Sequence, residues 1–447
     1  MLDRGQAPGQ QLERPFAERR GEASVGASGQ APPVGEECLM ERVVARGNLL
    51  AALRRVKRNG GNPGIDGMTV EALPGYLREH WSRIREVWLA GTYRPKPVRR
   101  VEVPKPGGGV RKLGMPTALD RFIQQAVRQP MWDPTFSGGS YGFRPGRSAH
   151  QAVAQAQRYL GEGYGWVVDL DLEKFFDRVN QDKRMSLVTK RVADRRVLKL
   201  IDCYLKAGAV TEAGFEATVE GTPQGGPLSP LLTTLRLDGL DKELERRGHR
   251  FVRYADDRHL FVKSARAGPR VLASVTRFLA QRLKLAVNPA KSAVGRPWRR
   301  TFLGFTFTGH RPNRRRGRER ALEACQREVR QRTSRTRGVS LMRVVGELRQ
   351  YLGGWYAYFG FTEAPSSFKE LDSWSRRRLR CYLWKQWGRR RYRELRRRGV
   401  SRALAGNTVK SAQGPWRLSH SPALAIALPG SYFDGLGVPR LHRPSHR

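Results

Sequence analysis

The chain has 447 residues, of which 39% are hydrophobic, so it is long enough for about two to four domains with real cores. Lys and Arg number 84 against 40 Asp and Glu, which gives a formal net charge of +44 at pH 7. No long uncharged apolar stretch is present, which excludes a membrane-spanning helix. The positive charge predicts a polyanionic partner, with nucleic acid ahead of a membrane surface.

The N-terminal region and the cysteines indicate a cytoplasmic protein. Residues 1–37 are rich in Gly, Pro, Ala and Gln and contain no apolar segment of the signal-peptide type, so we expect a disordered leader. No Cys-x-x-Cys pair or zinc-finger spacing occurs, which argues against a disulfide scaffold or a zinc module. The four cysteines are far apart, at Cys38, Cys203, Cys325 and Cys381.

The first predicted elements are helices and a hairpin. Apolar residues recur every three or four positions from Leu39 to Val56, where a Gly-rich segment follows, and again from Leu73 to Leu89. Residues 98–114 alternate around a Gly-Pro turn and predict two short strands.

The middle of the chain predicts an α+β domain. The side chains of residues 166–172 alternate between two faces, as in a strand. Residues 249–263 predict a strand, an acidic turn and a second strand, and helical runs lie between these two regions. After about residue 311, clusters of arginine and an amphipathic run from Leu341 to Trp355 predict a separate, all-helical basic module.

Acidic residues mark two of the predicted strands. Asp169 and Asp171 lie on the polar face of an otherwise apolar strand, and Asp256 and Asp257 follow Tyr254 at the turn of the later hairpin. If the strand and the turn face each other, their carboxylates can hold two Mg²⁺ ions about 4 Å apart for phosphoryl transfer. A solvated hairpin tip and solvent-facing strand acids are the alternatives.

A series of motifs resembles group II intron reverse transcriptases in both order and spacing. The resemblance covers roughly residues 40 to 440, and the ending WRLSHSPALAIALPGSYFDGLGVPRL (416–441) is similar to that of bacterial class C members, which lack the endonuclease domain. The motifs are GNPGIDGMTV (61–70), PKPGGGVRKLGMPT (104–117), SYGFRPGRSAHQAV (140–153), DLDLEKFFD (169–177), EGTPQGGPLSPLL (220–232), RYADD (253–257), NPAKS (288–292), FLGF (302–305) and YLGGWYAYF (351–359).

The resemblance implies a catalytic triad and its metal site. Asp171, Asp256 and Asp257 would be catalytic and, together with Leu172, would bind two Mg²⁺ ions. Asp171 is preferred to Asp169 because the family motif runs Asp-x-x-x-Phe-Phe-Asp from that position.

The resemblance also implies residues that bind nucleotide, template and primer. Phe176 would exclude a ribose 2′-hydroxyl, although a core position is the alternative for this side chain. The remaining nucleotide-binding candidates are Lys105, Arg111, Gln224 and Lys291, of which the first two have solvated surface charge as the alternative. Arg144, Tyr254 and Gly304 would contact the template or primer, with ordering of the fingers as the second role of Arg144 and a core role open for the apolar residues around Gly304.

The implied architecture is a right-hand polymerase. Fingers and palm with an antiparallel sheet would span 38–309, a helical thumb or maturase domain 310–388, and a small basic DNA-binding segment 389–447. The protein would copy RNA into DNA from deoxynucleoside triphosphates on an RNA template with a DNA primer. It would also bind intron RNA, assist splicing and use target DNA for insertion. Aromatic residues of the helical module would stack on RNA or fill its core: Trp355, Tyr356, Tyr358, Trp374, Trp384 and Trp387.

Two departures from the family pattern keep other functions open. Arg258-His259 follows the acidic turn and Thr233–Arg236 occupies another segment where relatives are more apolar, so we expect looser packing around the site. A maturase that binds intron RNA without polymerising is the main alternative. A domesticated or retron-like reverse transcriptase is a third.

Overall fold

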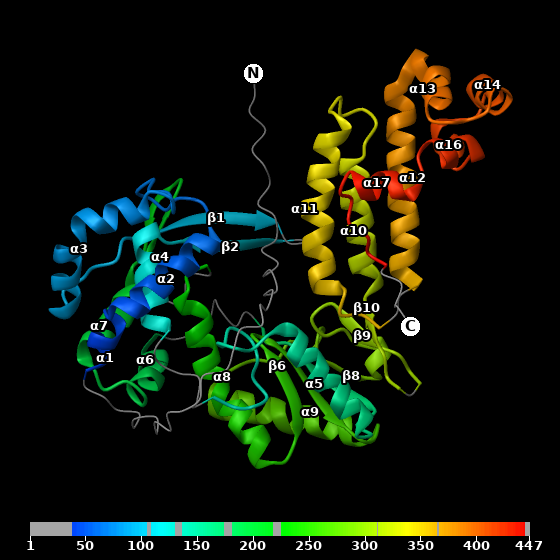
Figure 1. Cartoon of the computed structure of the whole chain (residues 1–447). Helices are drawn as coiled ribbons and strands as arrows, with labels where there is room; N and C mark the ends of the chain where they lie inside the picture. The colour runs from blue at the N-terminus through cyan, green and yellow to red at the C-terminus, as the bar shows by residue number, and fades with distance from the viewer. Residues whose placement is uncertain are drawn as a thin grey trace, which may run out of the picture. The chain divides into compact units, whose positions relative to one another are not determined.

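A computed structural model describes residues 38–104, 109–129, 136–173, 181–217, 225–310, 312–363 and 366–442. The chain divides into two compact units between Arg296 and Pro297. We call the residues described up to 296 the sheet unit and those from 297 the helical unit, and each is described by itself (Figure 1). No helix within the described ranges is long and apolar enough to cross a membrane.

The first predicted helical region of the sheet unit forms two helices. These are α1 (Leu39–Val43) and α2 (Arg46–Asn59), and Gly60 ends α2 with a φ of 60°, a conformation that glycine adopts without strain. The second predicted helix is α3 (Leu73–Leu89), with Ile84 and Trp88 buried as its periodicity predicts.

The predicted hairpin belongs to a four-stranded sheet of order β2-β1-β4-β5. Strands β1 (Val98–Pro104) and β2 (Val110–Met115) pair antiparallel, which confirms both strands. Strand β4 (Ala209–Thr211) joins β1 in parallel and continues into β5 (Gly214–Glu216).

Five further helices belong to the sheet unit, and side-chain caps mark the starts of three of them. The Ser148 and Gln151 side chains form a capping box, Thr117 accepts from the Asp120 N–H, and Asp194 caps a third helix. The helices are α4 (Ala118–Arg128), α5 (Ala149–Gly161), α6 (Gln181–Thr189), α7 (Arg195–Lys206) and α8 (Leu228–Arg246).

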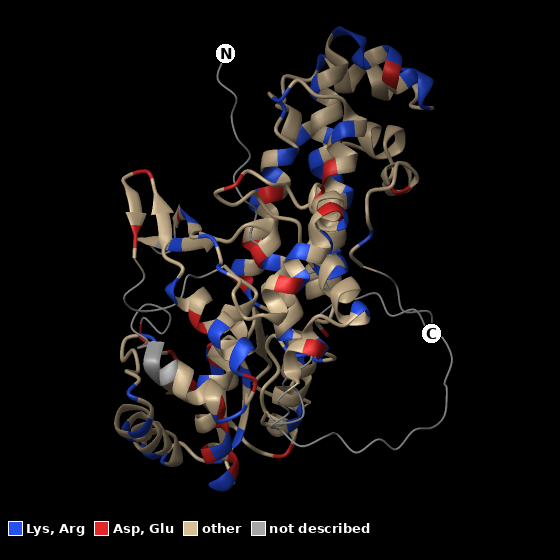
Figure 2. Ribbon diagram, turned by 90° about the vertical axis from the view of Figure 1, so that its left-hand side faces the viewer, with Lys and Arg blue, Asp and Glu red and all other residues tan. Residues whose placement is uncertain are grey.

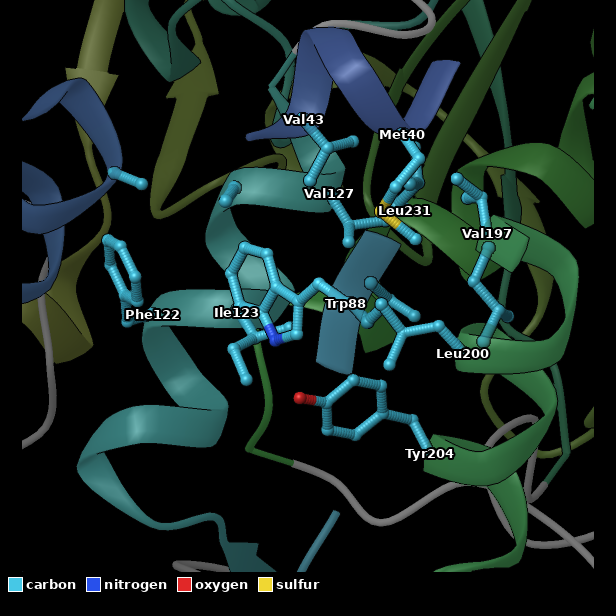
Figure 3. Close-up of a cluster of buried hydrophobic side chains, with 14 of the residues drawn as sticks. Met40, Val43, Trp88, Phe122, Ile123, Val127, Val197, Leu200, Tyr204 and Leu231 are labelled. Carbon is cyan, nitrogen blue, oxygen red and sulfur yellow. The ribbon is translucent and has the colours of Figure 1, made fainter. Parts of the chain in front are cut away.

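A large apolar cluster contains residues of α1, α2, α3, α4, α7 and α8. Figure 3 shows the side chains of Trp88, Ile123, Leu200 and Tyr204 directed toward one another from α3, α4 and α7. The Trp88 and Phe122 rings stack with centroids 6.1 Å apart. Burial of this apolar surface fixes the helices that support the first sheet.

The second sheet has the order β6-β7-β3-β8 and is antiparallel throughout. Its strands are β6 (Arg250–Tyr254), β7 (Asp257–Val262), β3 (Trp166–Leu170) and β8 (Ala293–Gly295). One face buries Val168 and Leu170 against α8 and α9 (Ala267–Phe278), which continues as the π-helical turn η2 (Leu279–Leu283). The α+β prediction for the middle of the chain is therefore confirmed.

The helical unit is mostly helical, as its sequence predicts, but it contains a small hairpin before its long helices. Strands β9 (Phe305–Phe307) and β10 (Arg315–Gly317) pair antiparallel, so Arg315 and Arg316 lie on a strand and the prediction of an all-helical module is wrong there. Strands of three residues are too short to show a hydrophobic period.

One short helical turn precedes the hairpin in the chain, and the other helices of this unit follow it. The long ones are α10 (Glu319–Arg332), α11 (Leu341–Phe359) and α12 (Ser366–Trp387). The short ones are η3 (Pro297–Arg299), η4 (Gly388–Arg390), α13 (Arg391–Arg397), α14 (Arg402–Lys410), α15 (Pro415–Leu418), α16 (Pro422–Ala427) and α17 (Gly430–Gly435).

Candidate active site

The predicted acidic turn connects β6 to β7. Tyr254 and Asp257 form the last pair of the hairpin, and Ala255 and Asp256 make the turn between them. Ala255 has a φ of 58°, which is a strained conformation for a residue with a Cβ. Such strain directly before two acids is typical of a functional position.

The second acidic segment lies beside this turn. Strands β3 and β7 pair antiparallel up to Leu170 opposite Arg258, so the next position places Asp171 beside Asp257 on the same face of the sheet. The Asp171 N–H donates to Ser292 Oγ over 2.9 Å, and its carbonyl accepts from the Asn288 N–H over 2.9 Å. The backbone that carries this carboxylate is therefore fixed from both sides.

Leu172 occupies a different environment. It forms a bridge with Val287, and its side chain is buried in the core beneath the sheet. A metal ion at this end of the sheet would therefore meet the backbone of Leu172 rather than its side chain.

The carboxylates influence one another. Desolvation by surrounding protein atoms, followed by the charge of Asp256, raises the pKa of Asp257 to about 6, and Asp169 and Asp171 act in the same direction. The ring of His259 opposes this rise. Asp169 lies opposite His259 in the β3–β7 pair, with 3.5 Å between Oδ1 and Nε2. Four acids thus share one edge of the sheet with little compensating charge.

Lys291 approaches this edge from the loop before β8. Its Nζ lies 3.4 Å from Asp171 Oδ2, and most of its side chain is exposed. This ion pair places a nucleotide-binding candidate next to a metal-ligand candidate.

Within the described residues, no three His, Cys, Asp or Glu side chains are gathered closely enough to hold a metal ion. The donor set suits Mg²⁺ chemically, because carboxylate oxygens are the ligands that this ion prefers.

A glycine-containing loop supports the acidic turn, and the sequence analysis did not identify this role. The Arg253 N–H donates to Gly139 O and the Tyr141 N–H donates to Arg253 O, both over 2.8 Å, so the loop pairs with β6. A Cβ added to Gly142 would lie 2.3 Å from the backbone nitrogen of Ala255. Only glycine permits this approach. The contact joins Gly142 to a turn far along the chain, so only the three-dimensional structure shows it.

Two candidates for template and primer contact lie at this loop. The Arg144 side chain is buried and donates from Nη1 to the carbonyls of Ser137 and Ser140, over 2.5 and 2.9 Å. These bonds support the ordering role considered for Arg144. Tyr254 is half-buried, with its ring centroid 6.2 Å from that of Phe143.

Several nucleotide-binding candidates lie outside the described residues. These are Lys105, Phe176 and Gln224, and for Arg111 the structure describes the backbone, which lies in β2 opposite Val103. The neighbouring Gly225 is described, and a Cβ there would lie 2.4 Å from the Gly114 carbonyl oxygen. Glycine is therefore required at position 225, because a Cβ there would collide with the protein's own backbone.

Gly304 belongs to the helical unit and has a φ of 80°. Phe302 and Phe305 on either side exchange backbone hydrogen bonds of 2.9 Å and are buried. The Tyr358 hydroxyl donates to the Leu303 carbonyl over 2.9 Å. The two phenylalanines of this motif are core residues of their unit, in line with the alternative given above, and Leu303 is half-buried.

The six aromatic candidates of the helical unit differ in how deeply their side chains are buried. Trp355, Trp384 and Trp387 are buried, whereas the other three candidates are half-buried: Tyr356, Tyr358 and Trp374. At least half of the predicted RNA-stacking residues are thus core residues.

The arginine clusters also differ from one another. Figure 2 shows Lys and Arg distributed along the helices of the chain. Arg376 is buried and pairs with Asp372 and Asp434, and Arg377 stacks on Trp416 at 4.1 Å. By contrast, Arg389 and Arg390 in η4 are exposed. Free positive charge is therefore concentrated after α12 rather than within it.

The Thr233–Arg236 departure is accommodated in α8 rather than loosening it. The hydroxyls of Thr233 and Thr234 donate to the carbonyls four residues earlier, over 2.9 and 3.0 Å. Arg236 donates from Nη2 to the Leu283 carbonyl over 2.9 Å. These bonds satisfy both hydroxyls and one guanidinium nitrogen, whereas Arg236 Nη1 is buried without a hydrogen-bond partner among the described residues.

Comparison with known families separates the chain into two matching regions. Residues 103–307 match the reverse transcriptase (RNA-dependent DNA polymerase) family, and residues 322–399 match the maturase-specific domain of group II introns. The acidic edge of the second sheet lies in the first region, and α10 to α13 lie in the second.

Two individual proteins and one solved structure are similar to parts of the chain. Protein YkfC of Escherichia coli (strain K12) is 32% identical over 321 residues, which cover 62% of this chain and 83% of that protein. The group II intron-encoded protein LtrA of Lactococcus lactis subsp. cremoris is 36% identical over 196 residues, 43% of this chain and 33% of LtrA. A solved partial Cas6-RT-Cas1–Cas2 complex is 24% identical, with a TM-score of 0.33, over 54% of this chain and 42% of that one.

Proposed function

Because the chain belongs to the family of group II intron-encoded reverse transcriptases and maturases, we propose that Asp171, Asp256 and Asp257 catalyse RNA-templated DNA synthesis. The observation that carries this proposal is the register of β3 and β7. It places Asp171 beside Asp257, and the turn adds Asp256. Residues more than 80 positions apart thus supply carboxylates to one edge of one sheet.

The three carboxylates would hold Mg²⁺. When bound, the metal would lower the pKa of the attacking hydroxyl and neutralise charge on the leaving pyrophosphate. The raised pKa of Asp257 supports this role, because a carboxyl group whose pKa is raised by neighbouring negative charge gains from a cation that it shares with those neighbours. Backbone bonds to Asp171 and the strained Ala255 hold two of the donors in place before any ligand binds.

Lys291 would change partners when substrate binds. In the structure it pairs with Asp171, and its exposed Nζ is free to turn toward a triphosphate. A cation on Asp171 would release Lys291 for this contact. The lysine would then bind or protonate the leaving phosphate oxygens.

The finer architecture follows from the same proposal. The first sheet with α1–α4 would be the fingers, the second sheet with α8 and α9 the palm, and α10–α12 the thumb or maturase region. Lys105, Arg111, Phe176 and Gln224 would bind the deoxynucleotide from the fingers side. Tyr254 and Gly304 would contact template or primer, with Arg144 acting by ordering the loop beside Tyr254.

Intron RNA would bind the exposed basic surface of the helical unit. The match to a maturase-specific domain supports this partner, as does the net charge of +44. RNA-directed synthesis on a DNA primer, assistance of splicing and insertion into target DNA would then be activities of one protein.

Primer extension tests the catalytic proposal. The full chain is given an RNA template, a DNA primer, deoxynucleotides and Mg²⁺, and is compared with Asp256→Asn. We expect the substitution to reduce extension by about a hundredfold or more, because it removes a metal-binding charge. Asp202→Asn, on the exposed part of α7, is the matched control and should extend normally.

Each outcome has a defined meaning. Loss of extension in Asp256→Asn alone supports the polymerase. A folded native chain that binds intron RNA but does not extend a primer contradicts it and favours the splicing cofactor.

A further inference from the structure

Arg258 follows Asp257 directly but lies on the opposite face of the sheet. It pairs with Leu170 on one side and with Arg253 on the other, and residues opposite each other share a face. That face carries the apolar core beneath the sheet, and Arg258 is completely buried there. A buried guanidinium therefore lies under the strand that begins with Asp257.

Asp241 of α8 is the acid that faces both arginines. Arg253 Nε donates to its two carboxylate oxygens over 3.0 and 2.7 Å, and Arg253 Nη1 donates to the Ala255 carbonyl over 3.1 Å. Arg258 Nη2 lies 3.8 Å from Asp241 Oδ1. Within the described residues, no guanidinium nitrogen of Arg258 has a hydrogen-bond partner. Arg253 thus makes the bonds that hold the turn, and Arg258 contributes charge.

The three side chains carry a net positive charge. Two guanidinium groups surround one carboxylate, and all three side chains are inaccessible to solvent. Burial lowers the pKa of Arg258 to about 10, which leaves it protonated at neutral pH. A charge in this environment acts over a longer range than an exposed one, because solvent does not screen it.

We propose that Arg258 weakens divalent-cation binding at the carboxylate edge through its buried charge. The proposal rests on the proposed function, since it assumes that Asp171, Asp256 and Asp257 bind the cation. Arg258 makes no hydrogen bond that shapes the turn, so its contribution is electrostatic. Its charge repels the cation, so its removal should tighten cation binding. Loss of a structural support would instead weaken cation binding.

Replacement of Arg258 by methionine separates the two explanations. Arg258→Met fills a similar volume, removes the charge and leaves Asp241 paired with Arg253, so no buried charge is stranded. Arg258→Lys keeps the charge and is the matched control. Mn²⁺ serves as the probe, and free Mn²⁺ is measured by electron paramagnetic resonance on the full chain without nucleotide, at fixed pH and low salt.

We expect Arg258→Met to bind Mn²⁺ about tenfold more tightly than the native chain, with Arg258→Lys within about twofold of native. The Mg²⁺ concentration for half-maximal primer extension should fall in parallel. Equal or weaker binding by folded Arg258→Met overturns the proposal, as does equally tightened binding by Arg258→Lys. Should Arg258→Met not fold, Arg258→Gln tests the same loss of charge.

Failure of the underlying function is distinguishable from failure of this inference. Native binding that Asp256→Asn does not reduce would place the Mn²⁺ site elsewhere and overturn both. Native binding that depends on Asp256 but is unchanged in Arg258→Met overturns the inference alone.

Discussion

At the scale of single residues, the site depends on charge and on close backbone contact. Asp257 has a pKa raised to about 6 by desolvation and by neighbouring acids, and Gly142 lets a distant loop touch the acidic turn. Both features concern the same four-residue segment, but the first governs ligand chemistry and the second governs geometry. They therefore give different predictions.

The raised pKa of Asp257 predicts a pH-dependent stability without metal. Between about pH 4 and 6 the folded chain binds more protons at this carboxyl than the unfolded chain, so its contribution to the unfolding free energy falls as pH rises through that range. Asp257→Asn should therefore be more stable than the native chain at pH 7.5 in the presence of a chelator. Solvent at this exposed residue reduces the size of the effect.

Urea unfolding at pH 4 and at pH 7.5 measures this dependence. The gain in midpoint for Asp257→Asn should be present at pH 7.5 and absent near pH 4. A gain that is the same at both values would contradict the shifted pKa, and Asp202→Asn serves as the control.

The contact at Gly142 predicts that a single methyl group displaces the turn. Gly142→Ala would place a Cβ 2.3 Å from Ala255 N, and backbone cannot move aside as a flexible side chain can. We expect a stability loss of about 1–3 kcal/mol and at least about a tenfold loss of primer extension. Gly138→Ala, in the same loop but with open space at the Cβ, should change neither. Equal behaviour of the two variants would show that the loop does not support the turn.

At the scale of elements, burial decides which basic residues can meet nucleic acid. Within α12, Arg376 pairs with acids, Arg377 stacks on Trp416 and Arg380 donates to the Leu428 carbonyl. By contrast, η4 and α13 present guanidinium groups to solvent. The arginine clusters of α12 and of η4 look alike in sequence but are therefore not equivalent.

This difference predicts a change in the salt dependence of RNA binding. Replacement of Arg389, Arg390 and Arg393 together by Gln should reduce the slope of log affinity against log salt by about two to three, since each lost phosphate contact removes about 0.7 to 0.9. Binding to a structured intron RNA is measured from about 50 to 300 mM salt.

A second triple variant controls for net charge. It replaces three exposed arginines of α3 in the sheet unit: Arg78, Arg83 and Arg85. An equal reduction in slope for both triples would mean that overall charge, and not the surface after α12, determines the affinity.

At the scale of the whole molecule, the chain has two compact units with separate cores. The large cluster around Trp88 lies in the sheet unit, and a second set of aromatic contacts, with Trp355 and Phe359 centroids 5.0 Å apart, lies in the helical unit. The hairpin that contains Gly304 packs on the second set.

Separate cores predict that a core substitution acts within one unit. Trp88→Ala should reduce the stability of the sheet unit by about 3–5 kcal/mol, because it removes a fully buried indole. Hydrogen exchange read by mass spectrometry should rise in α1–α4, α7 and α8 and stay unchanged in α10–α12. Leu50→Ala, at an exposed position of α2, should have no such effect. A uniform rise over both units would contradict the division.

Local patterns in the sequence were enough to predict several of the elements and to single out the acidic residues. Alternation in 166–172 and 249–263, and the periodicity of α2, α3 and α11, depend on local spacing, so they are readable without contacts. The ordered motifs pointed to a reverse transcriptase and maturase, and the family matches confirm it.

Only the tertiary structure decided which residues meet. The opposition of Asp171 and Asp257, the approach of Gly142 to Ala255 and the pairing of Arg253 and Arg258 with Asp241 join positions distant in sequence. Such pairs carry no periodic signal, because each depends on how strands and helices pack. The burial of a side chain also depends on this packing. Arg258, which departs from the family pattern, is therefore found as a buried charge beneath the site.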